Sequence, residues 1–327
     1  MNTNQLLKLF EQAGESFLSG ETVSKELGVS RTAVWKSIHK LQEQGYEFEA
    51  SRKLGYRLVG RPDPLDASIL EGMLKTRAFG RKLVVLQKVD STQNIVQQLA
   101  QQGAEEGTLV LAEQQLNGRG RMGRGWVSPY GKGLWMSMVL RPKLPVGSAP
   151  QLTLLTAVAL CRSLRAETAL DIGIKWPNDL MIGGRKLSGI LLESAAEDER
   201  LSYVVAGIGI SVNLTTEDYP AELLERAISL RLAAGRGFSR ASLAASFLLE
   251  WETLYDLYLT EGFAPIRSIW EALSVSLHKK TVLRTPQGSL EGTPVGLHET
   301  GALMVKMEDG TMQTLFSAEM GEVVPKS

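Results

Sequence analysis

Residues 118–126 read GRGRMGRGW, a run of glycines and arginines suited to binding an anion. Arginine presents a permanently charged, planar fork that pairs with a phosphate or carboxylate through two hydrogen bonds. Glycine puts no side chain between the backbone and such a ligand. We interpret this segment, called the arginine–glycine loop below, as an anion-binding loop. A flexible basic loop on the protein surface is the alternative interpretation.

The spacing of Gly118, Gly120 and Gly123 also spells GxGxxG, the dinucleotide-binding pattern. That pattern binds a dinucleotide when a strand precedes it, a helix opens directly from it and an acidic residue follows about 20 residues later. A strand is predicted at 108–115, but the proline and glycines within 129–133 oppose a helix after the loop, and no acid stands at the expected place. The sequence therefore does not predict a dinucleotide site.

Further polar groups stand at the ends of predicted strands in the central part of the chain. They are Asp90-Ser91-Thr92, Gln115, KWPND at 175–179, GRKLSG at 184–189 and Asn213. Polar groups that converge in this way are typical of a ligand site. Each also has a structural alternative: an N-cap for Ser91 and Thr92, a turn after Pro177 for Asn178 and Asp179, and a solvated hairpin-tip charge for Lys186.

The composition limits the kinds of partner. The chain has 327 residues, in which 36 Lys and Arg balance 36 Asp and Glu, so contact with nucleic acid requires a local basic patch. The single cysteine, Cys161, lies in an apolar helical run and is predicted to be in the core, while the three histidines are too scattered for a metal site or a catalytic triad. Without a signal peptide or a membrane-spanning segment, a soluble, cytoplasmic protein is expected.

Residues 1–62 predict a winged helix-turn-helix. Helices are expected at 3–14, 21–28 and 31–45, the last capped by Ser30 and with Val34, Ile38 and Leu41 on its inner face. Residues 46–58 then alternate around a turn near Arg52 and Lys53, as a β-hairpin wing does. Predicted DNA contacts are Ser30, Arg31, Thr32, Lys36, Lys40, Arg52 and Lys53. A small helical protein-interaction module is the competing interpretation.

The remainder predicts two further domains, which makes the chain an α+β multidomain protein. Residues 61–66, RPDPLD, contain two prolines and are interpreted as a linker. Residues 66–273 alternate strands with helices, the latter expected at 92–102, 151–166, 221–232 and 240–260, and form a mixed α/β domain of catalytic size. Residues 275–327 contain short strands separated by turns at PQG, HETG and EDG, a pattern typical of a small β-barrel.

Five motifs, in order, resemble the biotin protein ligases, also called biotin–acetyl-CoA-carboxylase ligases. They are DST (90–92), GRGRMGRGW (118–126), KWPND (175–179), GRKLSGIL (184–191) and GIGISVN (207–213). The winged helix is similar to that of the bifunctional subgroup, which also represses the biotin synthesis operon. The resemblance implies a central domain of the class II synthetase-like biotin/lipoate ligase type and a C-terminal SH3-like barrel.

The resemblance also implies the reaction. ATP adenylates the biotin carboxylate to biotinyl-5′-AMP with release of pyrophosphate, and a lysine of the biotin carboxyl carrier protein of acetyl-CoA carboxylase then accepts the biotin. The first step brings two anions together, so cations near the α-phosphorus lower its barrier. Arg119, Arg121 and Lys186 are the catalytic candidates, and Lys186 is the principal one.

The ligand contacts follow from the matching positions. Those for biotin are Ser91, Thr92, Gln115, Gly118, Arg119, Arg121, Lys186 and Gly189, of which the hydroxyl and amide groups would satisfy the ureido ring. Those for the nucleotide are Arg121, Trp126, Asn178, Asp179 and Asn213, with Trp126 stacked on adenine and Asp179 near Mg²⁺. Met122, where many relatives have a basic residue, and Gly125 depart from the family pattern, so ligand affinity and loop order can differ.

In such a protein the arginine–glycine loop is expected to order over the adenylate. The adenylate, as corepressor, is expected to promote a homodimer that places two winged helices on the operator DNA of biotin genes. Two alternatives stay open. A lipoate–protein ligase shares the adenylation chemistry but is not expected to carry the winged helix, and a ligand-sensing repressor without catalysis is opposed by the presence of Lys186 and the arginines.

Overall fold

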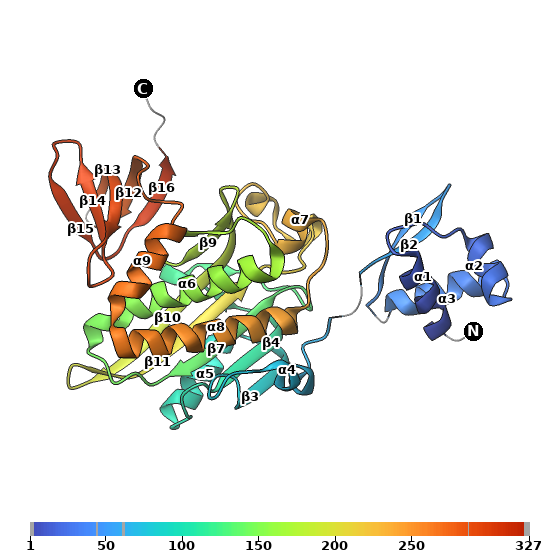
Figure 1. Ribbon diagram of the computed structural model, residues 1–327, viewed down its shortest axis with the longest axis horizontal. Helices are drawn as coiled ribbons and strands as arrows, with labels where there is room; N and C mark the ends of the chain where they lie inside the picture. The colour runs from blue at the N-terminus through green and yellow to red at the C-terminus, as the bar shows by residue number, and fades with distance from the viewer. Residues whose placement is uncertain (1–2, 44, 61–62, 287, 324–327) are drawn as a thin grey trace. The chain divides into compact units, whose positions relative to one another are not determined.

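The computed structural model describes residues 3–43, 45–60, 63–286 and 288–323. It consists of two compact units, residues 1–64 and 65–327 (Figure 1). The hydrophobic core of the first unit and the larger core of the second are built from separate sets of residues. The predicted linker at 61–66 begins with Arg61 and Pro62, which lie outside the described residues.

The first unit has the predicted winged helix-turn-helix arrangement. Its elements are α1 (Thr3–Ala13), α2 (Gly20–Leu27), α3 (Arg31–Glu43), β1 (Glu47–Ser51) and β2 (Gly55–Gly60). The Oγ atom of Ser30 accepts the backbone N–H of Ala33 at 3.2 Å, so the predicted N-cap is confirmed. The inner face of α3 is confirmed as well, because Val34, Ile38 and Leu41 are buried.

A seven-stranded sheet forms the centre of the second unit, in the order β3-β4-β7-β11-β10-β9-β8. The strands are β3 (Leu83–Val89), β4 (Leu109–Gln115), β7 (Leu134–Leu140), β8 (Gly173–Lys175), β9 (Asp179–Ile182), β10 (Arg185–Glu197) and β11 (Arg200–Ile210). Only β3 and β4 of this sheet run parallel. The mixed sheet agrees with the predicted central domain.

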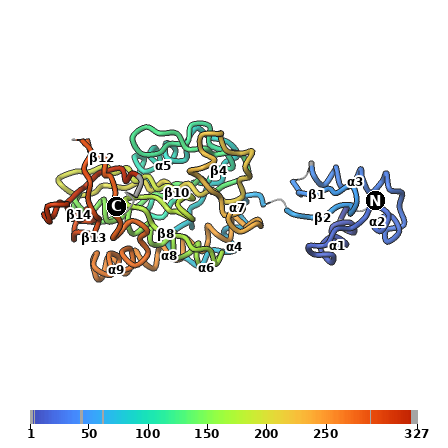
Figure 2. The backbone as a smooth tube through the Cα atoms, turned by 90° about the horizontal axis from the view of Figure 1, so that it is seen from above, coloured from blue at the N-terminus to red at the C-terminus, as the bar shows by residue number. Residues whose placement is uncertain are grey.

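Helices cover both faces of this sheet (Figure 2). Helix α5 (Thr92–Gln101) lies on one face, and α6 (Ala149–Thr168) and α8 (Arg240–Glu261) lie on the other, together with α9 (Phe263–Leu273). Helix α4 (Ala67–Met73) packs against α8. Cys161 of α6 is fully buried, as predicted, and burial raises the pKa of its thiol to about 11. None of the described helices is both long and apolar enough to cross a bilayer.

The helix predicted at 221–232 is wrong. The segment contains only a 3-10 turn, η4 (Ala221–Leu223), and the start of the short helix α7 (Leu230–Ala234). Between them the backbone pairs with β10: the N–H of Lys186 donates to the carbonyl of Arg226 at 2.7 Å, and the N–H of Ile228 donates to the carbonyl of Lys186 at 2.9 Å. This tertiary pairing overrides the local helical pattern, and it fixes the backbone of Lys186.

The last part of the second unit is a five-stranded antiparallel sheet, as predicted for an SH3-like fold. Its order is β15-β14-β13-β12-β16, with strands β12 (Thr281–Thr285), β13 (Gly288–Leu297), β14 (Leu303–Met307), β15 (Met312–Leu315) and β16 (Glu319–Val323). Turns occur at the predicted HETG and EDG, where Gly301 and Gly310 adopt φ values of 86° and 84°. The predicted PQG turn includes Gln287, which lies outside the described residues.

Candidate active site

A cavity of about 1670 Å³ is lined by the central sheet, the arginine–glycine loop and the C-terminal sheet. Many residues singled out in the sequence line it together: Ser91, Thr92, Gln115, Arg119, Arg121, Trp126, Asn178, Asp179, Lys186 and Gly189. The separate sequence motifs therefore converge on one site.

Asn213 and Gly118 are not among the residues that line this cavity. The side-chain amide of Asn213 instead bonds both backbone groups of Phe238, donating at 2.8 Å and accepting at 2.9 Å. A Cβ atom on Gly118 would lie 2.5 Å from the carbonyl oxygen of Trp126, so glycine here permits the close approach of two backbones. In this structure both residues support neighbouring segments, and their predicted ligand contacts remain predictions.

The arginine–glycine loop is a narrow hairpin. Its strands β5 (Gly118–Arg119) and β6 (Gly125–Trp126) flank a 3-10 turn, η1 (Arg121–Gly123). Met122 lies at the turn with φ 57° and 77% of its surface exposed. No helix opens from the glycines, so the structural context of a dinucleotide fingerprint is missing here, as the sequence indicated.

Each arginine of the loop contacts another segment of the second unit. The partners are Glu193 for Arg119, Asn178 and Ser317 for Arg121, and Glu319 for Arg124. The Arg119–Glu193 ion pair spans 2.7 Å, and Arg121 donates to the Oδ1 atom of Asn178 at 3.1 Å. Burial lowers the pKa of Arg121, but an arginine remains charged at neutral pH. These contacts favour an anion-binding loop over a free surface loop.

Lys186 stands between a carboxylate and an aromatic ring. Its Nζ atom lies 2.7 Å from Oδ1 of Asp179 and 5.3 Å from the ring centroid of Trp126. The turn between β9 and β10 is made by Gly183 and Gly184, so Lys186 belongs to the strand and is not a hairpin-tip charge. The lysine charge is therefore held at the cavity wall, where an anionic substrate can replace the carboxylate as its partner.

Two glycines make room for Trp126. Gly189 and Gly209 lie opposite each other on β10 and β11. A Cβ atom on Gly189 would lie 3.0 Å from Cζ3 of Trp126, and one on Gly209 would lie 2.5 Å from its Nε1 atom. Gly189 was predicted to admit a ligand; in this structure the space that it leaves is taken by the indole ring.

Thr92 and Gln115 form a polar network at another part of the cavity. The backbone N–H and the hydroxyl of Thr92 both donate to Oε1 of Gln115, at 2.9 and 3.1 Å, and the same hydroxyl lies 2.8 Å from Oγ of Ser137. Ser91 is in the N-cap position of α5, but its side chain makes no capping hydrogen bond. The N-cap alternative therefore does not account for the Ser91 hydroxyl.

Ser137 and Gln93 were missed in the sequence, although both line the cavity. Ser137 donates to Oε1 of Gln93 at 3.0 Å. The available signal for Ser137 was a single hydroxyl within the otherwise apolar strand LWMSMVL. A buried polar residue in such a strand needs a partner, and that need often marks a site.

The donor atoms of the cavity fit a magnesium ion that accompanies a nucleotide. Within the described part of the chain, no three His, Cys, Asp or Glu side chains gather as a metal site. Mg²⁺ needs fewer protein ligands than that, because it keeps several waters and binds substrate phosphates with one or two carboxylates. Asp179, which pairs with Lys186 in this structure, would supply one carboxylate, while the amide oxygen of the neighbouring Asn178 already accepts a hydrogen bond from Arg121.

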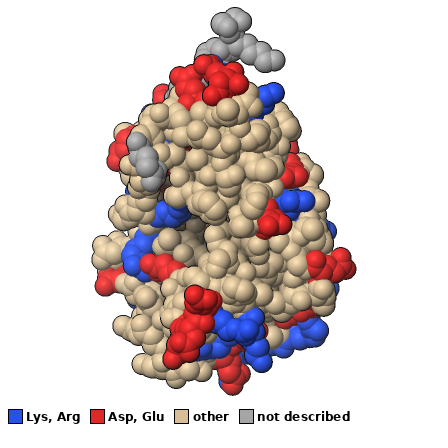
Figure 3. Space-filling model, turned by 90° about the vertical axis from the view of Figure 1, so that its left-hand side faces the viewer, with Lys and Arg blue, Asp and Glu red and all other residues tan. Residues whose placement is uncertain are grey.

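The residues predicted to contact DNA form an exposed set in the first unit. Ser30, Arg31, Thr32, Lys36 and Lys40 lie at or on α3, and Arg52 and Lys53 lie at the turn between β1 and β2. Trp35, which the sequence interpretation omitted, is 53% exposed on the same helix. Acidic and basic side chains are both present on the face shown in Figure 3, and the chain as a whole has no net charge, so we expect DNA binding to depend on this local set.

Comparisons with known proteins agree with this geometry. Residues 85–211 match the model of the Biotin/lipoate A/B protein ligase family, and residues 2–57 match an HTH domain. The chain is 43% identical to the bifunctional ligase/repressor BirA of Bacillus subtilis (strain 168), over 96% of this chain and 97% of that protein. It is 31% identical to BirA of Escherichia coli (strain K12), over 98% and 97% of the two chains.

A solved structure, the biotin protein ligase from Aquifex aeolicus in complex with biotin and ATP, is 29% identical to this chain. It superimposes with a TM-score of 0.64 and covers 74% of this chain and 98% of its own.

Proposed function

The chain belongs to the bifunctional biotin ligase/repressor family, and on this premise we propose that it couples biotin to a carrier protein through biotinyl-5′-AMP and represses biotin synthesis genes. The main support for ligase activity is that Arg119, Arg121 and Lys186 line one cavity. The same cavity contains the Thr92–Gln115 network. Such a cavity offers cations for phosphate and carboxylate groups, and hydroxyl and amide groups for a neutral polar ring.

In the first step a biotin carboxylate oxygen attacks the α-phosphorus of ATP. The new P–O bond forms as the bond to the bridging oxygen breaks, and pyrophosphate leaves with the electron pair. Arg119, Arg121 and Lys186 would oppose the negative charge that two anions bring to this point. Mg²⁺ bound by Asp179 and the phosphates would neutralise part of that charge.

The Thr92–Gln115 network would bind the ureido ring of biotin. Because Thr92 donates twice to Oε1 of Gln115, the amide group is held in one orientation before the ligand arrives. Ser91 adds a hydroxyl that makes no cap bond. Hydrogen bonds to the polar groups of the ureido ring would avoid the cost of burying those groups unpaired. Biotin has a ureido ring and lipoate does not, so the network favours biotin.

In the second step an amine of the biotin carboxyl carrier protein attacks the acyl carbon of the adenylate. A C–N bond forms, the C–O bond to the phosphate breaks, AMP leaves with the electron pair, and the nitrogen loses a proton to solvent. We place the reaction in the cytoplasm, where ATP and the carrier protein are both present.

Pyrophosphate release without a carrier protein tests the ligase proposal. With Mg-ATP, we expect release to depend on biotin and to be absent with lipoate. Equal release with lipoate would indicate a lipoate ligase. No release with either acid would point to a sensing repressor that lacks catalysis.

For repression, we propose that the adenylate is the corepressor and that it promotes a homodimer. Two winged helices would then contact two half-sites of an operator, with α3 in the major groove and the Arg52–Lys53 wing tip on phosphates. Support for this proposal comes from the exposed polar and basic residues of α3 and the wing, and from the relatives that are named ligase/repressors.

Sedimentation with and without biotinyl-5′-AMP, followed by a gel shift on DNA upstream of the host's biotin synthesis genes, tests repression. We expect the adenylate to convert monomer to dimer and to produce a shift that weakens as salt rises. A protein that stays monomeric with the adenylate and never shifts the DNA would refute the proposed repression. That result would not bear on the proposed ligase activity.

A further inference from the structure

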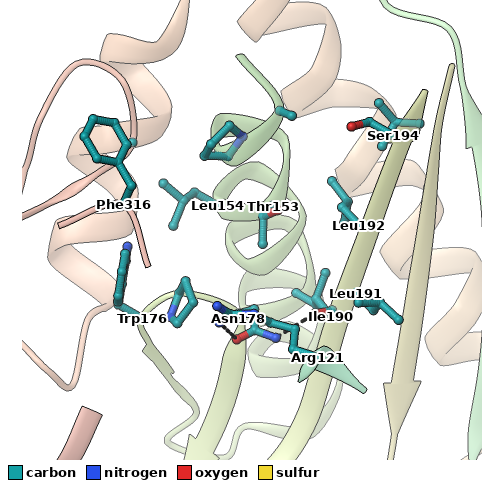
Figure 4. Close-up of a pocket in the computed structure, with 15 residues that line it drawn as sticks. Arg121, Thr153, Leu154, Trp176, Asn178, Ile190, Leu191, Leu192, Ser194 and Phe316 are labelled. Atoms are coloured by element: carbon teal, nitrogen blue, oxygen red, sulfur yellow. Dashed lines mark hydrogen bonds between the residues drawn. The ribbon is translucent and has the colours of Figure 1, made fainter. Parts of the chain in front are cut away.

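A second, smaller pocket of about 260 Å³ adjoins the active-site cavity. Figure 4 shows it between the first turns of α6, strand β10 and Phe316, which lies between β15 and β16. Arg121 and Asn178 line both the pocket and the cavity, and their 3.1 Å hydrogen bond lies at the boundary. A group bound in the pocket would therefore lie directly beside the cations of the site.

Most residues that line this pocket are apolar. Leu154, Ile190, Leu192 and Val204 contribute aliphatic side chains. Among the described residues that line it, Arg121 is the only ionisable one. The described lining residues therefore offer no carboxylate to bind a cation. The positive charge of Arg121 disfavours the binding of a second positive charge.

The pocket also contains an unused hydrogen-bond donor. Trp176 is only 3% exposed, and its Nε1 atom is buried without a partner. In Figure 4 the indole nitrogen is turned toward the Phe316 side of the pocket. A buried donor without an acceptor is uncommon in a folded protein, and a bound carbonyl group would satisfy it.

Phe316 stands at the rim with 68% of its surface exposed. A large exposed aromatic side chain beside a pocket is a typical anchor for a protein partner. The rim, the apolar walls and the lone donor together fit a polypeptide with an aliphatic side chain and a backbone carbonyl. An inorganic anion fits less well, because Arg121 is the one cation among the described lining residues and most of those residues are apolar.

We propose that this pocket, called the acceptor pocket below, binds the acceptor lysine of the carrier protein and delivers it to the adenylate. The proposal rests on the ligase function proposed above. The four methylenes of the lysine would contact the apolar walls, Trp176 would donate to a neighbouring backbone carbonyl, and Phe316 would pack against the carrier surface.

This environment also prepares the amine for attack. Only the neutral amine is a nucleophile, and both desolvation and a nearby cation favour the neutral form. The apolar walls supply desolvation, and Arg121 supplies the cation. Among the other charged groups that line the main cavity, Asp179 is paired with Lys186 at 2.7 Å, and Glu319 is paired with Arg124. In the proposed reaction the Asp179 carboxylate would bind Mg²⁺, so it would not be free to hold an ammonium ion there either.

Filling the acceptor pocket tests the proposal. Thr153 lines it from α6 and faces it in Figure 4, and it does not line the larger cavity that contains the Thr92–Gln115 network and Lys186. Thr153→Phe would occupy the pocket, and Thr153→Val, similar in shape, is the matched control. For each variant, pyrophosphate release, biotin transfer to a carrier domain, and interception of the adenylate by hydroxylamine, which needs no pocket, would be measured.

For Thr153→Phe we expect kcat/KM for the carrier to fall by about 10- to 100-fold, the usual effect of losing a pocket contact. Pyrophosphate release and hydroxylamine interception should stay within about twofold of wild type, as should all three rates in Thr153→Val. Phe316→Ala, at an exposed position, should also weaken carrier transfer alone.

Unchanged carrier transfer in Thr153→Phe would overturn the acceptor pocket. An equal loss of adenylation and transfer in that variant would also overturn it, because the pocket would then serve the first step, for example by holding pyrophosphate. If the wild-type protein forms no adenylate, the ligase proposal itself fails, which is a separate and recognisable result.

Discussion

Lys186 is positioned from several directions at once. Its backbone is paired with Arg226 and Ile228, its ammonium group is paired with Asp179, and the Trp126 ring lies beside it. A charge held in this way needs little reorganisation when phosphates arrive, which is how electrostatic stabilisation lowers a barrier. The same arrangement makes the lysine sensitive to small changes in its neighbours.

Gly189→Ala should disturb this arrangement. The new methyl group would lie 3.0 Å from Trp126 and 3.4 Å from Nζ of Lys186, so one of them must move. We expect the rate of adenylate formation to fall by about tenfold or more, since displacements near 1 Å can cost up to about 100-fold. The effect should be larger in Gly209→Ala, where the contact would be 2.5 Å.

Gly147→Ala is the matched control for this prediction. Nothing lies within 4 Å of its Cβ position, and its φ angle is ordinary, so its adenylation rate should equal that of wild type. A normal rate in Gly189→Ala would mean that the Trp126–Lys186 contact does not matter for the reaction.

Among the elements, the arginine–glycine loop is held by side chains of opposite charge that a ligand can replace. Glu193 and Glu319 pair with Arg119 and Arg124 at sites that are partly exposed to solvent. Exposed ion pairs contribute only about 0–1 kcal/mol, so they hold the loop weakly. An adenylate that binds the arginines inside the cavity would order the loop more firmly.

Trypsin, which cuts after arginine and lysine, measures this change directly. We expect cleavage after Arg119, Arg121 and Arg124 to slow by about tenfold or more when biotinyl-5′-AMP saturates the protein. The exposed wing tip at Arg52 and Lys53 is an internal control whose cleavage should not change. Equal cleavage of the loop with and without the adenylate would contradict loop closure.

Helix α8 holds the segment before β3 through one carboxylate. Glu252 accepts the backbone N–H groups of Arg77, Ala78 and Phe79 at 2.8, 2.9 and 3.2 Å. Burial alone would raise the pKa of Glu252, but the three backbone donors favour the charged form, and the net pKa is lowered. Its stabilising contribution is therefore full above the unfolded-state pKa and is lost as pH falls through the lower, folded-state value.

Glu252→Gln should reduce the free energy of unfolding by about 1–3 kcal/mol at pH 7, because a charge-assisted acceptor is replaced by a neutral one. The difference from wild type should shrink as the pH falls below about 4, where the unfolded carboxylate takes up a proton. Urea denaturation at both pH values measures it, with exposed Glu261→Gln on the same helix as the control. A pH-independent difference would rule out a charge effect.

The elements that the sequence predicted correctly are those whose pattern is local. Alternating residues identified the wing and most strands of the central sheet, and a cap residue located the start of α3. The helix expected at 221–232 failed because its backbone pairs with Lys186, about 40 residues earlier in the chain, a contact that no local pattern encodes.

The candidate site shows the same difference between features with a local sequence pattern and features that depend on distant contacts. Motifs predicted the residues that gather in the cavity, but not the partners of the arginines, since Glu193 is 74 residues from Arg119 and Glu319 is 195 residues from Arg124. Asn213 was predicted from its motif alone, and its two bonds to Phe238 depend on a loop whose path the sequence does not reveal.

For the molecule as a whole, each unit has its own core and its own chemistry. The first unit carries exposed basic residues on α3 and the wing, and the second contains the cavity, the acceptor pocket and the C-terminal sheet that contributes to both. Glu319 of β16 and Ser317, in the turn before it, contact the arginine–glycine loop. The C-terminal sheet thus helps to line the candidate active site.

The intact mass of a biotin carboxyl carrier domain, incubated with this protein, Mg-ATP and either biotin or lipoate, tests the ligase assignment most directly. The assay would be run with wild type, Lys186→Ala and Lys88→Ala, the last a control lysine on β3 outside the cavity. We predict a biotin-sized mass increase with wild type and Lys88→Ala, none with lipoate, and a rate at least about 100-fold lower with Lys186→Ala. A carrier mass that stays unchanged with wild type, or that increases equally fast with Lys186→Ala, would contradict this account.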